Sequence, residues 1–278
     1  MFVCEFFVQV AHAGVRYSAQ ELLIVSKAPA KIRLDKLLVD RALVSSRERA
    51  QALIIAGKVL INGQKIEKSG AAVAADCEIR LLGEDLRYVS RGGLKLEHAL
   101  EHWKINVEGK ICLDVGASTG GFTDCLLQHG AARVIAVDTG HGQIAFQLRQ
   151  DPRIRLLEKT NARYLTRVQV GEEVHLIAID VSFISATLVL PAVVAAAFPA
   201  DAENRAGHDL IVLIKPQFEV GREQVGKGGI VRDPAAHEEA IAKVRQAVIA
   251  LRTRMIDITE SPITGAEGNK EFLLYAVF

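Results

Sequence analysis

A glycine-rich turn between an apolar strand and an amphipathic helix limits most strongly what this chain can fold into. The apolar run Ile111–Val115 predicts a buried strand. The glycines that follow it allow a tight turn and a close approach of the backbone to a ligand. A helix with Phe122, Leu126 and Leu127 on one side comes next and ends at Gly130. Strand, glycine turn and helix in this order predict a nucleotide pocket in an open α/β sheet.

The spacing of this turn differs from the dinucleotide fingerprint, G-x-G-x-x-G, which would need glycine where the chain has Ser118. An acidic residue, Asp114, also precedes the first glycine. The turn therefore resembles motif I of methyltransferases that use S-adenosyl-L-methionine, in which the acid and the loop hold the methionine part. The resemblance implies that this cofactor binds at Asp114, Gly116, Ser118, Thr119, Gly120, Gly121, Phe122 and Thr123.

Strands alternate with helices from this point to the C-terminus. We expect strands at 111–115, 133–138, 154–158, 175–180 and 209–215, and helices near 122–129, 143–149, 184–198 and 234–252. This alternation predicts a mainly parallel sheet with helices on both faces. Two consecutive strands, 255–260 and 272–278, predict an antiparallel edge pair. The predicted fold class is α/β, a Rossmann-like methyltransferase sheet, preceded by a helix over residues 95–103.

A small α+β unit is predicted before the sheet, over residues 31–86. Leucines at helical spacing mark a first helix, and Ser45 with Glu48 predicts a capping box that opens a second. The pair Asn62-Gly63 predicts a hairpin with a type I′ turn. In order, R-L-D, S-R, G-x-V and N-G resemble the alpha-L RNA-binding module of the small-subunit ribosomal protein S-four (S4); a generic small domain is the alternative. The candidates for RNA contact are Arg33, Arg47, Arg49, Lys58, Lys65 and Arg91.

The charge of this part of the chain is consistent with an anionic partner. Residues 31–92 carry a local charge of +4, so the rest of the chain carries −3 within a net charge of +1. Such a segment suits RNA, although an ordinary solvated surface would look the same. Residues 1–30 are expected to be a disordered extension, 87–93 a linker with Gly92-Gly93, and 94–278 the methyltransferase domain.

The cysteines and the hydropathy argue against metal and membrane binding. The four cysteines are scattered, with no C-x-x-C and no Cys/His cluster at zinc spacing, so no metal is expected. Buried free thiols suit a reducing cytoplasm. No apolar run approaches about 18 residues, and the N-terminus lacks the basic start of a signal peptide. We therefore predict a cytoplasmic protein that does not span a membrane.

Polar residues follow several of the predicted strands. Asp138 can accept hydrogen bonds from ribose hydroxyls, or it can cap a helix. Asn161 lies where a neighbour of adenine would sit, or it is a simple loop amide. Asp180 and Lys215 end two strands that we expect to be adjacent, so they should lie close together. They would form either part of an active site or a structural ion pair.

The motifs together resemble the TlyA family, whose members are also named haemolysin A. The runs that carry the resemblance are S-R-G-G-L-K-L from Ser90, the turn from Asp114 to Asp124, N-A-R from Asn161, D-V-S-F-I-S from Asp180, K-P-Q-F-E from Lys215, G-G-I-V from Gly228 and G-N-K-E from Gly268. The resemblance spans about residues 31–278. It implies an enzyme that methylates the ribose 2′-hydroxyl of cytidine in 16S or 23S ribosomal RNA, with ribosomal subunits as partners.

The same resemblance implies a catalytic tetrad of Lys95, Asp180, Lys215 and Glu271. A 2′-hydroxyl is a weak nucleophile and must lose its proton as it attacks a methyl group, which a lysine amine can accept in its neutral form. We favour Lys215 as this base, with the two carboxylates orienting the amines and Lys95 near the 2′-oxygen and a phosphate. Two departures from the family are Lys270, usually valine, which adds charge beside the site, and His141, commonly tyrosine.

Three other functions compete with RNA methylation. The alternative family name suggests a pore-forming cytolysin, which the missing signal peptide and membrane hairpin argue against. Pseudouridine synthases also carry S4 modules, but they lack a nucleotide-binding glycine turn. A non-catalytic RNA-binding protein is disfavoured by the complete tetrad.

Overall fold

The computed structural model describes residues 31–44, 46–82, 87–199 and 205–278. The chain divides into two compact units, the first ending at Asp85 and the second beginning at Leu86. The expected disordered extension, residues 1–30, lies outside the described residues. Each unit has its own apolar core, so each is described by itself.

The first unit packs two helices against short strands. Its elements are β1 (Lys31–Arg33), α1 (Leu34–Asp40), α2 (Arg47–Ile55), β2 (Val59–Ile61), β3 (Gln64–Lys65), β4 (Ala72–Ala74) and β5 (Ile79–Leu81). β2 pairs with both β3 and β5, while β1 pairs with β4. The core between these layers is apolar, and the side chains of Leu34, Leu38, Ile54 and Val59 are fully buried in it.

The predicted hairpin of this unit is confirmed, and the predicted helix cap is corrected. Asn62 and Gly63 both have positive φ angles, 47° and 79°, between the paired strands β2 and β3, as a type I′ turn requires. The residue that caps α2 is Ser46, whose side chain accepts a hydrogen bond from Arg49 N at 3.2 Å. Ser45, the expected cap, lies outside the described residues.

The second unit is built on a seven-stranded sheet within the described residues. In spatial order the strands are β11 (Met255–Glu260), β12 (Phe272–Val277), β10 (Asp209–Ile214), β9 (Leu176–Ile179), β6 (Ile111–Val115), β7 (Arg133–Val137) and β8 (Ile154–Leu157). The five strands from β10 to β8 run parallel. β12 is antiparallel to both of its neighbours, so the predicted edge pair is confirmed.

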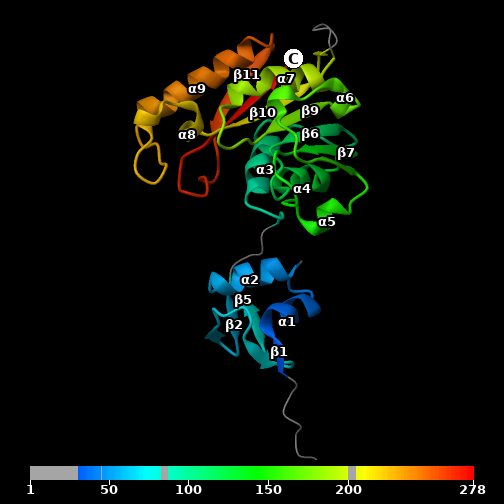
Figure 1. Ribbon diagram of the computed structural model, residues 1–278, viewed down its shortest axis with the longest axis vertical. Coiled ribbons are helices and arrows are strands. Elements are labelled where there is room, and N and C mark those ends of the chain that lie inside the picture. Colours follow the sequence, from blue (N-terminus) through cyan, green and yellow to red (C-terminus); the bar gives the residue numbers. More distant parts are fainter. Residues whose placement is uncertain (1–30, 45, 83–86, 200–204) are drawn as a thin grey trace, which may run out of the picture. The chain divides into compact units, whose positions relative to one another are not determined.

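Helices cover both faces of this sheet, as predicted (Figure 1). One face packs against α3 (Gly92–His102), α4 (Gly121–Gln128) and α5 (Phe146–Arg149). The other face packs against α6 (Arg167–Val170), α7 (Leu190–Ala197) and α9 (Pro234–Ile249). The short helix α8 (Pro216–Glu219) follows β10.

The helix α3 begins three residues earlier than expected, inside the run predicted as a linker. A Cβ atom on Gly93 would lie 2.3 Å from the Tyr88 ring, and one on Gly121 would lie 3.0 Å from Gly93 N. The two glycines therefore let the start of α3 pack tightly against Tyr88, which is 2% exposed, and against α4. Tyr88, Gly92 and Gly93, in the run predicted as a linker, are therefore part of the packed second unit.

The strand order fixes where a ligand can bind. β6 lies between β7 on one side and β9 on the other, so the chain progresses outward in both directions from β6. At such a switch point the loops after neighbouring strands turn apart and leave a crevice at the carboxyl ends. The glycine turn, Asp138, Asp180 and Lys215 all follow strands at this end.

Among the helices formed by the described residues, none has the length and apolar character needed to cross a membrane.

Candidate functional site

The glycine turn after β6 is shaped by close backbone contacts. Gly116 has a φ angle of 93°, and a Cβ atom there would lie 2.2 Å from the carbonyl oxygen of Asp180. Gly120 has a φ angle of 97°, and a Cβ atom there would lie 2.4 Å from Leu148. Any larger residue at either position would strain the backbone and collide, so the turn needs glycine for its path.

Asp114 supports this turn from the interior. Its side chain is fully buried, and Thr123 Oγ1 donates a hydrogen bond of 2.6 Å to Asp114 Oδ2. The second oxygen, Oδ1, has no hydrogen-bond partner among the described residues. Burial raises the pKa of Asp114 to about 7, and the nearby charges of Asp180 and Asp138 act in the same direction.

This raised pKa predicts a pH dependence of stability. Between its ordinary value of 3.8 and about 7, the folded chain holds a proton on Asp114 that the unfolded chain has released. Stability should therefore fall as the pH rises through this window, by roughly 1.4 kcal/mol per pH unit and on the order of 4 kcal/mol in total. Denaturant unfolding of the unliganded protein at several pH values should show wild type losing stability relative to Asp114→Asn as the pH rises. Parallel curves for the two proteins would contradict the assignment.

Two cavities meet at the carboxyl ends of the strands. The first, of about 550 Å³, lies between α3, the loop after β9 and the loop before β12; the predicted residues that line it are Arg91, Lys95, Gly116, Ser118, Thr119, Gly121, Phe122, Asp180, Lys215 and Glu271. The second, of about 490 Å³, is lined by Ser118, Asp138, Asn161, Asp180 and Lys215. Gly116, Asp180 and Lys215 border both cavities, so they lie where the two join.

Asp138 holds the turn and the loop after β7 at the second cavity. Its Oδ2 accepts a hydrogen bond from Ser118 N at 2.8 Å, and its Oδ1 accepts one from Gly140 N at 2.6 Å. Asn161 lines the same cavity, but its side-chain oxygen accepts a bond from Arg163 N and so caps a short helical turn. Its carbonyl is engaged locally, as the simpler of the two interpretations expected.

The four residues of the predicted tetrad form two ion pairs, one of them buried on both sides and the other with a partly exposed carboxylate. Lys215 Nζ lies 2.5 Å from Asp180 Oδ1 and donates a hydrogen bond of 2.8 Å to Ser182 Oγ. Lys95 Nζ pairs with Glu271 Oε2, and the side chains of these two residues are 10% and 2% exposed. All four residues border the first cavity. The prediction that the ends of β9 and β10 bring Asp180 and Lys215 together is confirmed by this distance.

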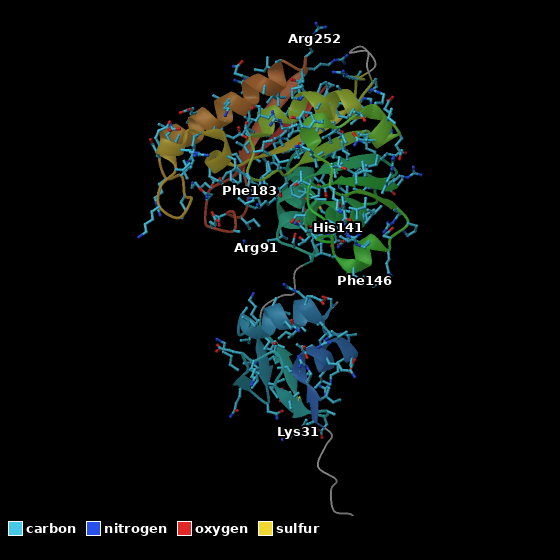
Figure 2. All side chains as sticks on the ribbon, in the orientation of Figure 1. Lys31, Arg91, His141, Phe146, Phe183 and Arg252 are labelled. Atoms are coloured by element: carbon cyan, nitrogen blue, oxygen red, sulfur yellow. The ribbon has the colours of Figure 1, made fainter. Side chains whose placement is uncertain are left out.

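Several cavity residues were not predicted from the sequence. Phe183 is 91% exposed, has a φ angle of 65°, and its ring centre lies 5.3 Å from that of Phe218. Phe183 lines the first cavity together with the predicted Arg91, and both are labelled in Figure 2. Ser90 and Gln217 line it as well, and Gln217 Oε1 is buried without a partner among the described residues. The positive φ of a bulky residue is the feature that marks Phe183, and a sequence does not reveal it.

The two departures from the family pattern lie outside the cavities. Lys270, expected to add charge beside the site, directly precedes Glu271 and forms an exposed ion pair with Glu260 on β11 at 3.3 Å. His141 Nδ1 contacts Glu158 Oε2 at 2.7 Å, and Arg149 also pairs with Glu158. The Arg149 guanidinium lowers the pKa of Glu158 to about 2.

In the first unit, a buried carboxylate organises two of the predicted RNA-binding arginines. Asp35 is fully buried and accepts two hydrogen bonds from Arg33, at 3.0 and 2.8 Å, one from Arg47 at 3.0 Å and one from Gln51 at 3.0 Å. The Arg33 guanidinium holds the pKa of Asp35 well below its usual range. Both arginine side chains remain more than half exposed. Of the other candidates, Lys58 is exposed and Lys65 pairs with Glu67.

Comparison with known proteins gives the same two parts. The model of the FtsJ-like methyltransferases matches residues 88–278, and that of the S4 domain matches residues 32–76. YqxC of Bacillus subtilis is 46% identical over 88% of this chain and 85% of its own. The 16S/23S rRNA (cytidine-2′-O)-methyltransferase TlyA of Mycobacterium tuberculosis is 45% identical over 88% and 89%. A solved Streptococcus thermophilus structure, named as a hemolysin, is 42% identical over 90% and 89%, with a TM-score of 0.66.

The matches exceed two thirds of each relative's length and include both units. The chain therefore belongs to the FtsJ-like methyltransferases and, among them, to the TlyA family.

Proposed function

We propose that this protein transfers a methyl group from S-adenosyl-L-methionine to the 2′-hydroxyl of a cytidine in ribosomal RNA. The observation that carries the proposal is the junction of the two cavities at Asp180 and Lys215. One cavity has the features of a nucleoside site, and the other contains two buried amines beside carboxylates. The name of the relative from Mycobacterium tuberculosis supports both the RNA and the position of the methyl group.

The second cavity suits the cofactor. Its volume of about 490 Å³ lies within the range of small-molecule sites. The Asp138 carboxylate, held by two backbone N–H groups, stands at the end of β7, where an acid can accept hydrogen bonds from ribose hydroxyls. Backbone groups of Gly116 and Ser118, which line both cavities, would hold the methionine part together with Thr119, which lines the first. When bound, the cofactor supplies an electrophilic methyl group.

The first cavity suits the nucleotide that receives the methyl group. Lys215, fixed by Asp180 and Ser182, would take the 2′-hydroxyl proton at Nζ or stabilise the charge that develops on the 2′-oxygen. Lys95, held by Glu271, would bind the 2′-oxygen or a neighbouring phosphate. The exposed ring of Phe183, packed against the half-buried ring of Phe218, offers a stacking surface for a base.

The S4 domain would supply affinity for ribosomal RNA. Asp35 fixes Arg33 and Arg47 side by side with their outer edges exposed, which suits a bidentate contact with phosphate. Arg49, Lys58 and Lys65 would add contacts, and Arg91 would guide the strand at the mouth of the first cavity. Such a substrate implies that the enzyme works in the cytoplasm, where ribosomes are modified.

The proposal is tested by methyl transfer from labelled cofactor to unmodified 16S- and 23S-containing ribosomal subunits, followed by mapping of the label. We expect 2′-O-methylcytidine. Asp138→Ala should weaken cofactor affinity roughly 10- to 100-fold in calorimetry, because it removes charge-assisted hydrogen bonds. Asp151→Ala, which removes a carboxylate paired with Arg153, is the matched control and should bind normally. Label on a base, or leakage of liposomes without any RNA methylation, would overturn the proposal.

A further inference from the structure

Two loops form one wall of the first cavity, and each contains a motif whose role the tetrad leaves unexplained. The first loop, residues 226–231, contributes Gly229 to the cavity and contains the run G-G-I-V. The second, residues 261–271, contributes Ile263, Thr264 and Glu271 and contains the run G-N-K-E. Only Glu271 of these two runs belongs to the tetrad. The role of the other residues in the runs is therefore still to be explained.

The side chain of Asn269 joins the two loops. It is 1% exposed, and both the oxygen and the nitrogen of its side-chain amide form hydrogen bonds to the first loop. Its Oδ1 accepts a hydrogen bond from Val231 N at 2.9 Å, and its Nδ2 donates one to Gly229 O at 2.8 Å. A buried amide with both ends engaged is a specific connection, because an apolar residue would leave two backbone groups without partners.

Backbone hydrogen bonds within the second loop link Asn269 to the position of Glu271. The carbonyl of Asn269 accepts a hydrogen bond from Gly265 N at 2.9 Å, and the carbonyl of Glu271 accepts one from Ser261 N at 2.9 Å. A Cβ atom on Gly265 would lie 2.5 Å from Glu271 Oε1, so this glycine leaves the space that the carboxylate fills. The loop that Asn269 closes is therefore the loop against which Glu271 packs.

We propose that Asn269 is a positioning residue: it holds the cavity wall together and sets Glu271 against Lys95. The inference rests on the proposed function, since it concerns the same site. Glu271 reaches Lys95 from a loop rather than from the interior of a strand, so its placement depends on how that loop is fastened. A displacement of about 1 Å at such a site can cost roughly 10²-fold in rate.

Three variants test the inference. Asn269→Ala removes both side-chain hydrogen bonds. Asn269→Asp keeps an acceptor for Val231 N but sets a carboxylate oxygen against the Gly229 carbonyl. Ser261→Ala is the matched control, because it removes a buried hydroxyl from the same loop whose hydrogen bond, to Ile263 O at 2.8 Å, stays within that loop. Folding is verified by circular dichroism, and cofactor affinity by calorimetry.

We expect Asn269→Ala to lose about 10- to 100-fold in kcat with unchanged cofactor affinity, and Ser261→Ala to stay within about twofold of wild type. For Asn269→Asp, the ratio of its rate to that of wild type should rise as the pH falls from about 8 to 6. Burial favours the protonated carboxyl, which can donate to Gly229 O as the amide does. His237, which contacts Val231 O, and Glu267, near Gly229, are present in both proteins, so the ratio removes their titration.

A second measurement is independent of methyl transfer. The Lys95 amine is paired and buried, so an amine-labelling reagent should modify it slowly in wild type and at least several times faster in Asn269→Ala. Faster labelling with wild-type cofactor binding supports the positioning role even if the RNA substrate proves to be different. Equal labelling, or wild-type kcat in Asn269→Ala, would overturn it. Absence of methyl transfer by wild type itself would instead count against the proposed function.

Discussion

Replacing Lys215 with alanine is expected to lower the rate of methyl transfer roughly 10²–10⁴-fold, the size of a general-base contribution. Its amine lies 2.5 Å from Asp180 and borders both cavities, so it can reach a hydroxyl at their junction. Single-turnover transfer from labelled cofactor to ribosomal subunits measures the loss. Lys110→Ala is the matched control, because Lys110 pairs with Asp209 at 3.1 Å, at the opposite end of β10. It should transfer methyl groups at close to the wild-type rate.

Lys215→Arg separates the two chemical roles open to this side chain. A guanidinium keeps the positive charge but does not give up its proton in proteins. If Lys215 accepts the hydroxyl proton, the arginine variant should fail almost as badly as the alanine variant. Near-normal turnover would mean that Lys215 acts only by stabilising charge, and Lys95 would become the better candidate for the base. Wild-type rates in Lys215→Ala would end the assignment altogether.

The parallel sheet was predictable because most of its strands are apolar runs, and each is followed by a polar or glycine residue. Ile111–Val115 and Asp209–Ile214 are almost wholly buried, and such runs predict strands covered on both faces. The same local logic located Asp180 and Lys215, because neighbouring parallel strands end at the same edge. The prediction therefore succeeded where adjacency in the sheet followed from sequence pattern alone.

The prediction failed where distant residues decide local structure. The helix expected at 184–198 begins only at Leu190, because Glu219 accepts hydrogen bonds from Ser185 Oγ and from Ala186 N at 2.7 Å. These bonds come from a residue more than 30 positions away, and the segment they hold, Ala186–Leu188, forms a short 3-10 helix before α7 begins. Asp35 and Asn269 lie within quoted motifs, but their structural roles could not be predicted for the same reason, since the sequence does not show which partners surround them.

Lys95 and Glu271 were both predicted as site residues, but from the family resemblance and not from the local sequence pattern. Nothing in the local pattern joins two residues that are 176 positions apart, and only the family resemblance named both. The structure adds that they form a buried pair, held by α3 on one side and by the loop before β12 on the other. Variants can separate the contribution of this pair to the folding free energy from its contribution to the rate of methyl transfer.

Lys95→Met and Glu271→Leu should each destabilise the protein by about 3–5 kcal/mol, because each leaves one buried charge without its partner. The double variant, with no charge to bury, should recover most of that stability. Activity should not recover: all three variants should lose at least about 10²-fold in methyl transfer, the usual cost of removing a preorganised charged donor. Denaturant unfolding and single-turnover transfer, measured on the same preparations, give the two quantities.

The double variant is the decisive test. Because it is expected to fold, its rate of methyl transfer shows whether the two charges are needed for the reaction. A Lys110→Met and Asp209→Leu pair gives the control, since it removes an ion pair at the other end of the sheet, away from both cavities. If the Lys95→Met/Glu271→Leu protein regained both stability and turnover, the pair would be a structural ion pair. If it regains stability alone, the two charges are retained at a cost in folding free energy because methyl transfer requires them, as the tetrad assignment predicts.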